Sequence, residues 1–336
     1  MRAFVIDRYK APLTQRQMPD PQPGPGQVLV AIAATSVNPL DFKLRNGEFK
    51  AVLPMAMPLI LGGDLAGTVI ALGAGATRFK IGDEVFGRPD PIGTFAERIA
   101  VAETDLALKP ASLNMTEAAS LPLVALTAWQ VLVERAALKP GQKILIHAGS
   151  GGVGTIAVQI AKHLGATVAA TTSTDNVELV RDLGADIVID YRKENFAERL
   201  TDYDVVLNTL GPDILERSLS VLKRGGKLIS ISGPPDPDFA RAIGANWAIR
   251  QVLRLLSASI RRKARAKGVN YSFLFMHADG GQLAEIARLV DAGAIRPVID
   301  RVFGFDDLPV AVERSESGRA RGKIVVTVDP GTARAG

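Results

Sequence analysis

Three glycines, at positions 149, 151 and 154, have a spacing that suits the binding of a phosphorylated cofactor. They follow an apolar, β-branched run at residues 143–148 and precede residues 155–164, where apolar side chains recur at helical spacing. In a strand–loop–helix unit such glycines form a tight turn and let the backbone approach a pyrophosphate, which the helix N-terminus attracts. This order of elements predicts a dinucleotide site. Its expected contacts are Gly149, Ser150, Gly151, Gly152, Val153 and Gly154.

The end of the next predicted strand, at residues 167–172, indicates which dinucleotide is bound. An NAD site normally has an Asp or Glu there to accept hydrogen bonds from the ribose, and this strand end has none. The residues that follow are donors that suit a 2′-phosphate, and the third strand should bring an aromatic side chain and two cations beside them. NADPH is therefore favoured over NADH. The residues concerned are Ser173, Thr174, Asn176, Tyr191, Arg192 and Lys193.

Asp175 interrupts this run of donors, and its carboxylate would repel a phosphate if it faced the site. Asp175 and Glu178 have the spacing of a capping box, in which the first side chain accepts from the backbone of the following helix. We therefore expect Asp175 to cap that helix, with its carboxylate turned toward backbone N–H groups.

The elements around the glycine loop alternate regularly between strand and helix. Strands are expected at residues 143–148, 167–172, 187–191, 204–210, 227–232 and 271–276, and helices at 154–164, 177–183, 195–200 and 214–222. This alternation predicts a doubly wound parallel sheet of strand order 3-2-1-4-5-6 that binds its ligand at the carboxyl ends of the strands. The ends of the fourth and fifth strands add Leu210, Gly211, Ile231, Ser232 and Gly233 to the expected cofactor contacts.

The rest of the chain alternates short apolar runs with Pro and Gly turns, which is typical of a small barrel-like β domain. Because 336 residues exceed what one core usually organises, we expect two domains and an α/β fold class. Residues 1–122 and 278–336 would form the β-rich domain, and residues 123–277 the dinucleotide domain. Strands are expected in the former at residues 1–7, 28–33, 67–72, 95–101, 298–302 and 323–328, with a helix at 282–292.

The composition excludes several classes of chemistry. The chain has no cysteine, so disulfides, thiol catalysis and a cysteine-based zinc site are excluded. No run approaches the ~20 apolar residues of a membrane span, and residues 1–7 resemble a strand rather than a signal peptide. A cytoplasmic location is the expectation.

Five further motifs accompany the glycine loop: SVNPLDFKLRNG (36–47), LGGDLAGTV (61–69), FKIGDEVFG (79–87), LPLVALTAWQVL (121–132) and GRARGKIVV (318–326). Together with HAGSGGVGTIAVQIAKHLGA (147–166), they resemble the medium-chain dehydrogenase/reductase superfamily over nearly the whole chain. The branch that the chain resembles is the zinc-free quinone oxidoreductase, ζ-crystallin and alkenal/enone reductase group. The resemblance implies a GroES-like β-rich domain beside a Rossmann domain.

The departures from zinc-dependent relatives concern the ligand positions. Asn38 stands where those enzymes have a Cys ligand, and the sequence Gly62-Gly63-Asp64 stands where they have Gly-His-Glu. We therefore expect no metal. Without a Lewis acid the acceptor must take hydride readily, as quinones and α,β-unsaturated carbonyls do by moving charge onto oxygen. The resemblance favours site roles for Asn38 and Asp41, with a turn-capping Asp41 as the alternative.

The resemblance also extends the cofactor site. It implies that Thr127 lies near the nicotinamide, unless its hydroxyl is bonded within its own helix. It implies that the loop bearing Arg321 and Lys323 closes on the cofactor, unless this is a solvated basic loop. His147 is expected to be a residue of the strand end, rather than a ligand or an acid–base group.

The net charge of +5 comes from one segment, residues 249–267, which has seven basic residues and no acidic one, and without which the net charge would be −2. This distribution argues against nucleic-acid binding. The segment is expected to be one amphipathic helix. The sequence leaves four alternatives for what this helix contacts: an anionic membrane, solvent, a partner subunit or a phosphate-rich substrate.

The sequence thus predicts a zinc-independent, NADPH-dependent oxidoreductase that transfers hydride to a small electrophile, either a quinone or an enal or enone. A homodimer is expected, with the sixth strand of the sheet as a pairing edge. The alternative is a sensor or structural protein that binds NADPH with little turnover and contacts a membrane surface.

Overall fold

The computed structural model describes residues 1–50 and 54–328. The chain divides into two compact units, Met1–Leu126 with His277–Gly336, and Thr127–Met276. The boundaries expected from the sequence are 122/123 and 277/278, within a few residues of these. Each unit has its own hydrophobic core, one in the β-rich unit and one in the unit with the parallel sheet.

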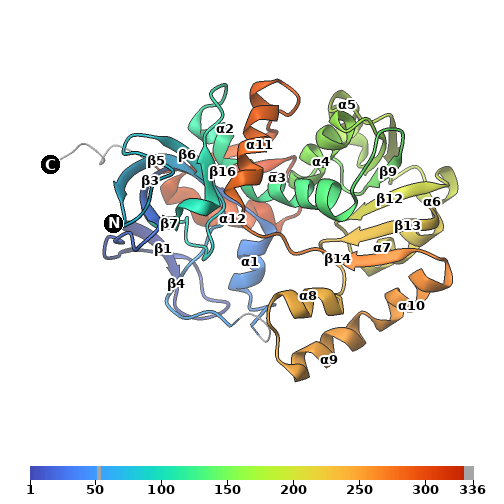
Figure 1. Cartoon of the computed structure of the whole chain (residues 1–336), viewed down its shortest axis with the longest axis horizontal. Coiled ribbons are helices and arrows are strands. Elements are labelled where there is room, and N and C mark those ends of the chain that lie inside the picture. The colour runs from blue at the N-terminus through green and yellow to red at the C-terminus, as the bar shows by residue number, and fades with distance from the viewer. Residues whose placement is uncertain (51–53, 329–336) are drawn as a thin grey trace. The chain divides into compact units, whose positions relative to one another are not determined.

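The first unit contains a seven-stranded sheet of order β15-β16-β3-β5-β6-β8, with β7 also paired to β3 (Figure 1). All its neighbouring strands are antiparallel except β15 and β16. A three-stranded sheet of order β2-β1-β4 belongs to the same unit. The strands are β1 (Arg2–Ile6), β2 (Thr14–Gln17), β3 (Gln27–Val37), β4 (Leu59–Ile60), β5 (Leu65–Leu72), β6 (Glu84–Gly87), β7 (Arg98–Ala102), β8 (Leu106–Leu108), β15 (Ile299–Gly304) and β16 (Lys323–Thr327).

Strand β3 positions the functional residues of this unit. Its first part alternates between buried and partly buried side chains, with Val28, Val30 and Ile32 in the core. Its last four residues are all buried, and β16 pairs with them antiparallel, with Val37 opposite Ile324. The end of β3 therefore delivers its polar side chains into the interior of the unit.

The helices of the first unit are α1 (Pro39–Arg45), α2 (Met115–Ala119), α11 (Gly280–Asp291) and α12 (Leu308–Glu316), while α3 (Pro122–Trp129) runs across the boundary between the units. Helix α1 follows β3 directly, with Pro39 at its first position, where a missing N–H costs nothing. Asp279 caps α11 by accepting a hydrogen bond from the backbone N–H of Gln282.

The second unit contains a parallel sheet of order β11-β10-β9-β12-β13-β14. In chain order this is 3-2-1-4-5-6, so the expected doubly wound topology is confirmed. The strands are β9 (Lys143–Ile146), β10 (Thr167–Thr172), β11 (Ile187–Asp190), β12 (Tyr203–Asn208), β13 (Leu222–Ser230) and β14 (Asn270–Phe273). The helices are α4 (Gly152–His163), α5 (Val177–Asp182), α6 (Phe196–Arg199), α7 (Pro212–Arg217), α8 (Pro237–Ala242), α9 (Trp247–Leu256) and α10 (Ala258–Ala266).

The expectation of a single helix at residues 249–267 is wrong, because α9 ends at Leu256 and α10 begins at Ala258. The buried Ser257 stands between them, and both its backbone N–H and its hydroxyl donate to the carbonyl of Leu253. Such a side-chain bond competes with the helical pattern, which explains the break. Within residues 1–50 and 54–328, no helix has the length and hydropathy that a membrane span requires.

Candidate functional site

The glycine loop lies between β9 and α4, as the sequence predicts. A Cβ on Gly154 would lie 2.1 Å from the carbonyl oxygen of Ala148, and one on Gly149 would lie 2.9 Å from the Cβ of Ala170. A Cβ on Gly151 would meet only Ala148, at 3.3 Å. The protein's own packing therefore requires Gly149 and Gly154, and it leaves more room at Gly151, where the sequence predicts a pyrophosphate.

The first turn of α4 suits an anion. Gly151 is the N-cap and brings no side chain to the backbone N–H groups, which carry the positive end of the helix dipole. Ser150 connects this loop to the end of β10, because its hydroxyl accepts hydrogen bonds from Thr172 at 2.9 Å and from the amide of Asn176 at 3.2 Å. Loop, helix start and strand end therefore form one polar surface.

The ends of β10 and β11 bring together the residues expected at the 2′-phosphate. The Thr174 hydroxyl donates to the Asp190 carboxylate at 2.6 Å, and this bond is the first cause that keeps the pKa of Asp190 below its usual value. Lys193 Nζ lies 3.5 Å from the same carboxylate. Tyr191 is 59% exposed beside them. Asp190, an acid at the end of the third strand, is not among the residues expected from the sequence.

Asp175 does not cap helix α5, so this expectation is wrong. Residues Thr174–Asn176 form a 3₁₀ turn, and Asn176 is the N-cap of α5. The extra turn moves Asp175 away from the helix start. Its exposed carboxylate instead lies 3.8 Å from Nη1 of Arg192.

The ends of β12 and β13 hold the next group of expected contacts. The carbonyl of Leu210 accepts from the Asn208 amide at 2.8 Å and from the Ser232 hydroxyl at 2.7 Å. The N–H of Gly233 donates to the Ser230 hydroxyl at 2.8 Å. Ile231 lies between these residues, and Gly211 is the N-cap of α7. Within the part of the chain that the structure describes, the buried Oδ1 of Asn208 has no hydrogen-bond donor, so this strand end retains a free acceptor.

His147 is a buried residue at the end of β9. Its Nε2 lies 2.9 Å from the Ser218 hydroxyl, whose own hydrogen goes to the carbonyl of Ile214. Nε2 must therefore donate, and Nδ1 accepts from the Thr171 hydroxyl at 3.1 Å. Burial, followed by the charge of Arg217, lowers the pKa of His147 to about 3. The ring is neutral and serves packing, in agreement with the sequence analysis.

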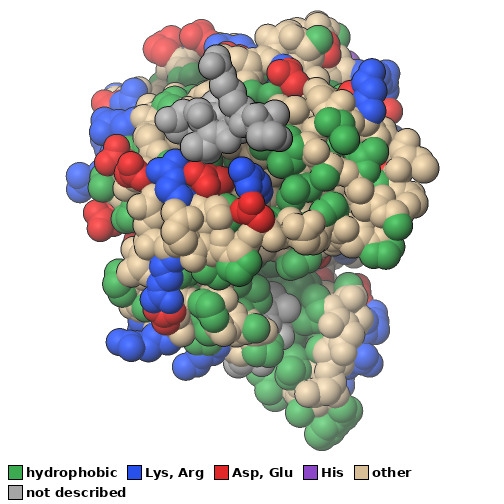
Figure 2. All heavy atoms as spheres, turned by 90° about the vertical axis from the view of Figure 1, so that its left-hand side faces the viewer, with side chains coloured by type: hydrophobic (Ala, Val, Ile, Leu, Met, Phe, Trp, Pro, Cys, Tyr) green, Lys and Arg blue, Asp and Glu red, His purple; other side chains and the backbone are tan. Residues whose placement is uncertain are grey.

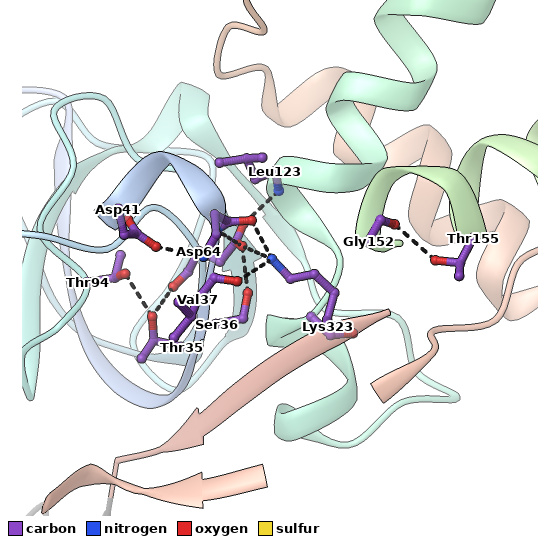
Figure 3. A network of polar contacts seen from close by, with 12 residues as sticks. Thr35, Ser36, Val37, Asp41, Asp64, Thr94, Leu123, Gly152, Thr155 and Lys323 are labelled. Atoms are coloured by element: carbon purple, nitrogen blue, oxygen red, sulfur yellow. Dashed lines mark hydrogen bonds and ion pairs between the residues drawn. The ribbon is translucent and has the colours of Figure 1, made fainter. Parts of the chain in front are cut away.

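A second group of polar side chains lies inside the first unit, around the carboxylate of Asp64 (Figure 3). Asp64 is completely buried, and Oδ1 accepts from the backbone N–H of Leu123 at 2.6 Å. Oδ2 accepts from the Ser36 hydroxyl at 2.6 Å, the Asn38 amide at 2.7 Å and Lys323 Nζ at 3.1 Å. We call Ser36, Asn38, Asp64 and Lys323 the Asp64 cluster.

Lys323 is the first residue of β16 and is 4% exposed, so it does not lie in a solvated loop. Its ammonium group donates to the carbonyl of Val37 at 3.2 Å, to the side-chain oxygen of Asn38 and to Asp64. Arg321, two residues earlier, is exposed, and its backbone N–H donates to Asp300 at 3.0 Å. Thr127, which the resemblance places near the nicotinamide, is buried in α3.

The cluster sets the orientation of the Asn38 amide. Its oxygen accepts from the Lys323 ammonium, so its nitrogen is directed to Asp64 and one N–H remains for another acceptor. The carboxylate of Asp41 accepts a hydrogen bond from the backbone N–H of Asn38 at 2.7 Å. This is the turn-capping role that the sequence analysis gave as the alternative for Asp41. Burial raises the pKa of Asp41 to about 7, and the N–H groups of Asn38 and Gly62 oppose this rise only in part.

The donor set of the cluster does not suit zinc. Its members are an amide, a hydroxyl, one carboxylate and an ammonium group, and the cation that neutralises Asp64 is Lys323. Among the residues that the structure describes, there is no group of three His, Cys, Asp or Glu side chains that holds a metal. Sequence reasoning noted Asp64 only as a departure from a zinc motif and missed Ser36. The available signal was two opposite charges, Asp64 before the apolar run at residues 65–72 and Lys323 at the start of the apolar run at residues 324–326.

The chain thus combines a doubly wound unit, which has a glycine loop at a helix start, with a β-rich unit that holds a buried polar cluster. Together these features define a two-domain dinucleotide-dependent oxidoreductase. Comparison with known proteins agrees. Residues 24–111 match the alcohol dehydrogenase GroES-like domain family, and residues 183–326 match the zinc-binding dehydrogenase family.

Three relatives illustrate the similarity. The mitochondrial NAD(P)H oxidoreductase RTN4IP1 of Mus musculus is 38% identical, over 98% of this chain and 89% of the relative. The chloroplastic NADPH-dependent alkenal/one oxidoreductase of Arabidopsis thaliana is 35% identical, over 89% and 72%. The structure of the quinone oxidoreductase from Coxiella burnetii is 31% identical, with a TM-score of 0.83 over 98% of this chain and 99% of that one. The chain belongs to the medium-chain dehydrogenase/reductase superfamily, in its zinc-free branch.

Proposed function

We propose that this protein is a zinc-independent, NADPH-dependent reductase that transfers hydride to a quinone or to the β-carbon of an enal or enone. The observation that carries the proposal is the Asp64 cluster. At the positions that resemble zinc-ligand motifs, the chain has an oriented amide, Asn38, and a buried carboxylate, Asp64, which Lys323 of β16 neutralises. Such groups suit an acceptor that delocalises negative charge onto oxygen without a Lewis acid.

The residues of the second unit fit a phosphorylated dinucleotide, which supplies the hydride when bound. The glycine loop and the first turn of α4 would hold its pyrophosphate. Arg192 and Lys193 lie beside Tyr191 and face carboxylates at 3.8 and 3.5 Å. A 2′-phosphate carries more negative charge than either carboxylate, so it would compete for both cations and support NADPH as the cofactor.

In the first unit, we assign to Asn38 the hydrogen bond to the oxygen that gains charge. Lys323 and Asp64 hold the amide by its other atoms, so the remaining N–H needs little reorganisation during the reaction. Burial of the cluster excludes water and strengthens this interaction. The proton that completes the reduction comes from solvent.

Stopped-flow oxidation of NADPH tests the proposal, with a 1,4-benzoquinone and a 2-alkenal as acceptors and with a metal chelator present. We expect turnover under these conditions. Asn38→Ala should lower kcat by about a hundredfold or more, with NADPH affinity unchanged. Thr94→Val, which removes a buried hydroxyl pair with Thr35 in the same unit, is the matched control and should keep kcat within a few fold.

Two results would contradict the proposal. Activity that requires Zn²⁺ and a simple alcohol would restore metal chemistry. Tight NADPH binding without turnover over a broad panel of electrophiles would identify a sensor or a structural protein instead.

The proposal includes a homodimer and a weak membrane contact. Strand β14 is at the edge of the six-stranded sheet, and such an edge supports pairing with a second copy. The basic segment at residues 249–267 supports the membrane contact. The cytoplasmic location stays a prediction from the composition.

A further inference from the structure

Helix α9 exposes large apolar side chains on one side. Trp247 is 76% exposed, Leu255 is 74% exposed, and Val252 and Leu256 are each more than half exposed. At 3.6 residues per turn, Leu255, Val252 and Leu256 fall within an arc of about 100°, with Trp247 on the adjoining side. We call these four residues the α9 face. Hydrophobic side chains gather on the lobe at the bottom of Figure 2, the end at which Figure 1 shows α9.

This exposure is not left over from incomplete packing of the helix. An adjoining side of α9 already packs on a small core, in which Leu253 is 4% exposed and Ile249 joins residues of α8. Asp236 anchors this lobe to the sheet, because it caps α8 and also accepts the N–H of Phe273 in β14 at 3.0 Å. The α9 face is therefore held in place with its own apolar surface directed outward.

The stretch of chain that contains the α9 face has basic side chains and no acidic one. Between Asp238 and Asp279 there is no acidic residue. Arg254 lies beside Trp247 on the helix, and α10 continues the positive charge with exposed side chains. The basic residues of this stretch are Arg241 and Lys263, which form ion pairs with Asp238 and Glu216, together with Arg250, Arg254, Arg261, Arg262, Arg265 and Lys267.

We propose that the α9 face docks on an anionic lipid bilayer, with its apolar side chains in the interface and the neighbouring arginines at the headgroups. Trp and Leu are suited to the boundary of headgroups and acyl chains, and long arginine side chains reach outward from it. A second copy of the chain is a poorer occupant, because a symmetric contact would place these positive charges against one another. This surface gives the proposed membrane contact its residues and its lipid chemistry.

Sedimentation of the full chain with vesicles tests the surface. One set of vesicles is phosphatidylcholine alone, and the other contains roughly a third of phosphatidylglycerol. We expect binding to the anionic vesicles that weakens as salt is raised, because the Debye length falls below ~10 Å above about 0.1 M. Leu255→Ser should weaken binding about tenfold, and Arg254→Glu about fivefold or more.

Matched controls are available in the other unit. Ile81 is 63% exposed, so Ile81→Ser changes a comparable apolar side chain, and Arg288→Glu makes the same change in net charge as Arg254→Glu. Both controls should bind anionic vesicles as the wild type does. All four positions are exposed, so the variants should fold, which NADPH binding checks.

Equal binding to neutral and anionic vesicles would overturn the proposal, as would no binding to either. Wild-type binding by Leu255→Ser or Arg254→Glu would also overturn it. Self-association that Leu255→Ser abolishes, without vesicle binding, would identify the face as a contact between copies of the chain. Vesicle binding requires no turnover, so its failure leaves the reductase proposal standing, and absent turnover leaves the vesicle result standing.

Discussion

The ion pair between Lys323 and Asp64 is expected to be the most sensitive interaction of the first unit. Its atoms lie 3.1 Å apart, and neither residue is more than 4% exposed. Lys323→Met removes the ammonium group but leaves the carboxylate buried. Removing one partner of a buried pair costs about 3–5 kcal/mol. Because Ser36, Asn38 and Leu123 still donate to Asp64, we expect the lower end, about 3 kcal/mol.

A double-mutant cycle separates the pair from its surroundings. Asp64→Asn leaves the buried ammonium with neutral oxygens as its acceptors and no negative charge, so this change should also cost about 3 kcal/mol. The double variant buries neither charge, and we expect it to recover about 2 kcal/mol relative to the sum of the single changes.

Hydrogen exchange of the β3 and β16 amides measures these free energies, because it reports the opening of this unit separately from the other. Arg16→Met is the control, since Arg16 and Asp7 form an ion pair in the same unit in which each side chain is at least 45% exposed. That change should cost less than about 0.5 kcal/mol. If Lys323→Met costs no more than the control, or if the single changes add without coupling, the reasoning is refuted.

Three further predictions concern the second unit. Gly151→Ala should weaken NADPH binding at nearly unchanged stability. Gly154→Ala should also destabilise the unit, because its Cβ would lie 2.1 Å from a backbone carbonyl oxygen. Fluorescence titration of NADPH and urea unfolding distinguish the two variants. Arg192→Ala should raise KM for NADPH about tenfold while KM for NADH changes little, and equal changes would remove Arg192 from the 2′-phosphate site. His147 has a folded pKa of about 3 against about 6.5 unfolded, so acid protonates the unfolded chain first. Stability that is fully present above pH ~6.5 should fall toward pH ~3, by up to ~1.4 kcal/mol per pH unit, and His147→Gln should flatten this decline in urea unfolding measured across pH.

Local patterns were sufficient for the dinucleotide half of the protein. The glycine spacing follows from close approaches within one loop, and the strand order follows from the alternation of strand and helix along the chain. The same kind of reasoning failed at Asp175 and Ser257. A 3₁₀ turn displaces the first, and the hydrogen bonds of the second interrupt a helix whose hydrophobic pattern continues.

The Asp64 cluster could not be derived from any local pattern. Asp64 and Lys323 are separated by most of the chain, and the pairing of β16 with β3 brings Lys323 to the carbonyl of Val37. The sequence identifies Asn38 as a site residue by resemblance, but the orientation of its amide depends on Asp64 and Lys323, which come from two distant segments. Periodicity and steric limits act between neighbours in sequence and can be predicted from it. The energy of a buried charge depends on which distant group neutralises it, and only the folded chain determines that group.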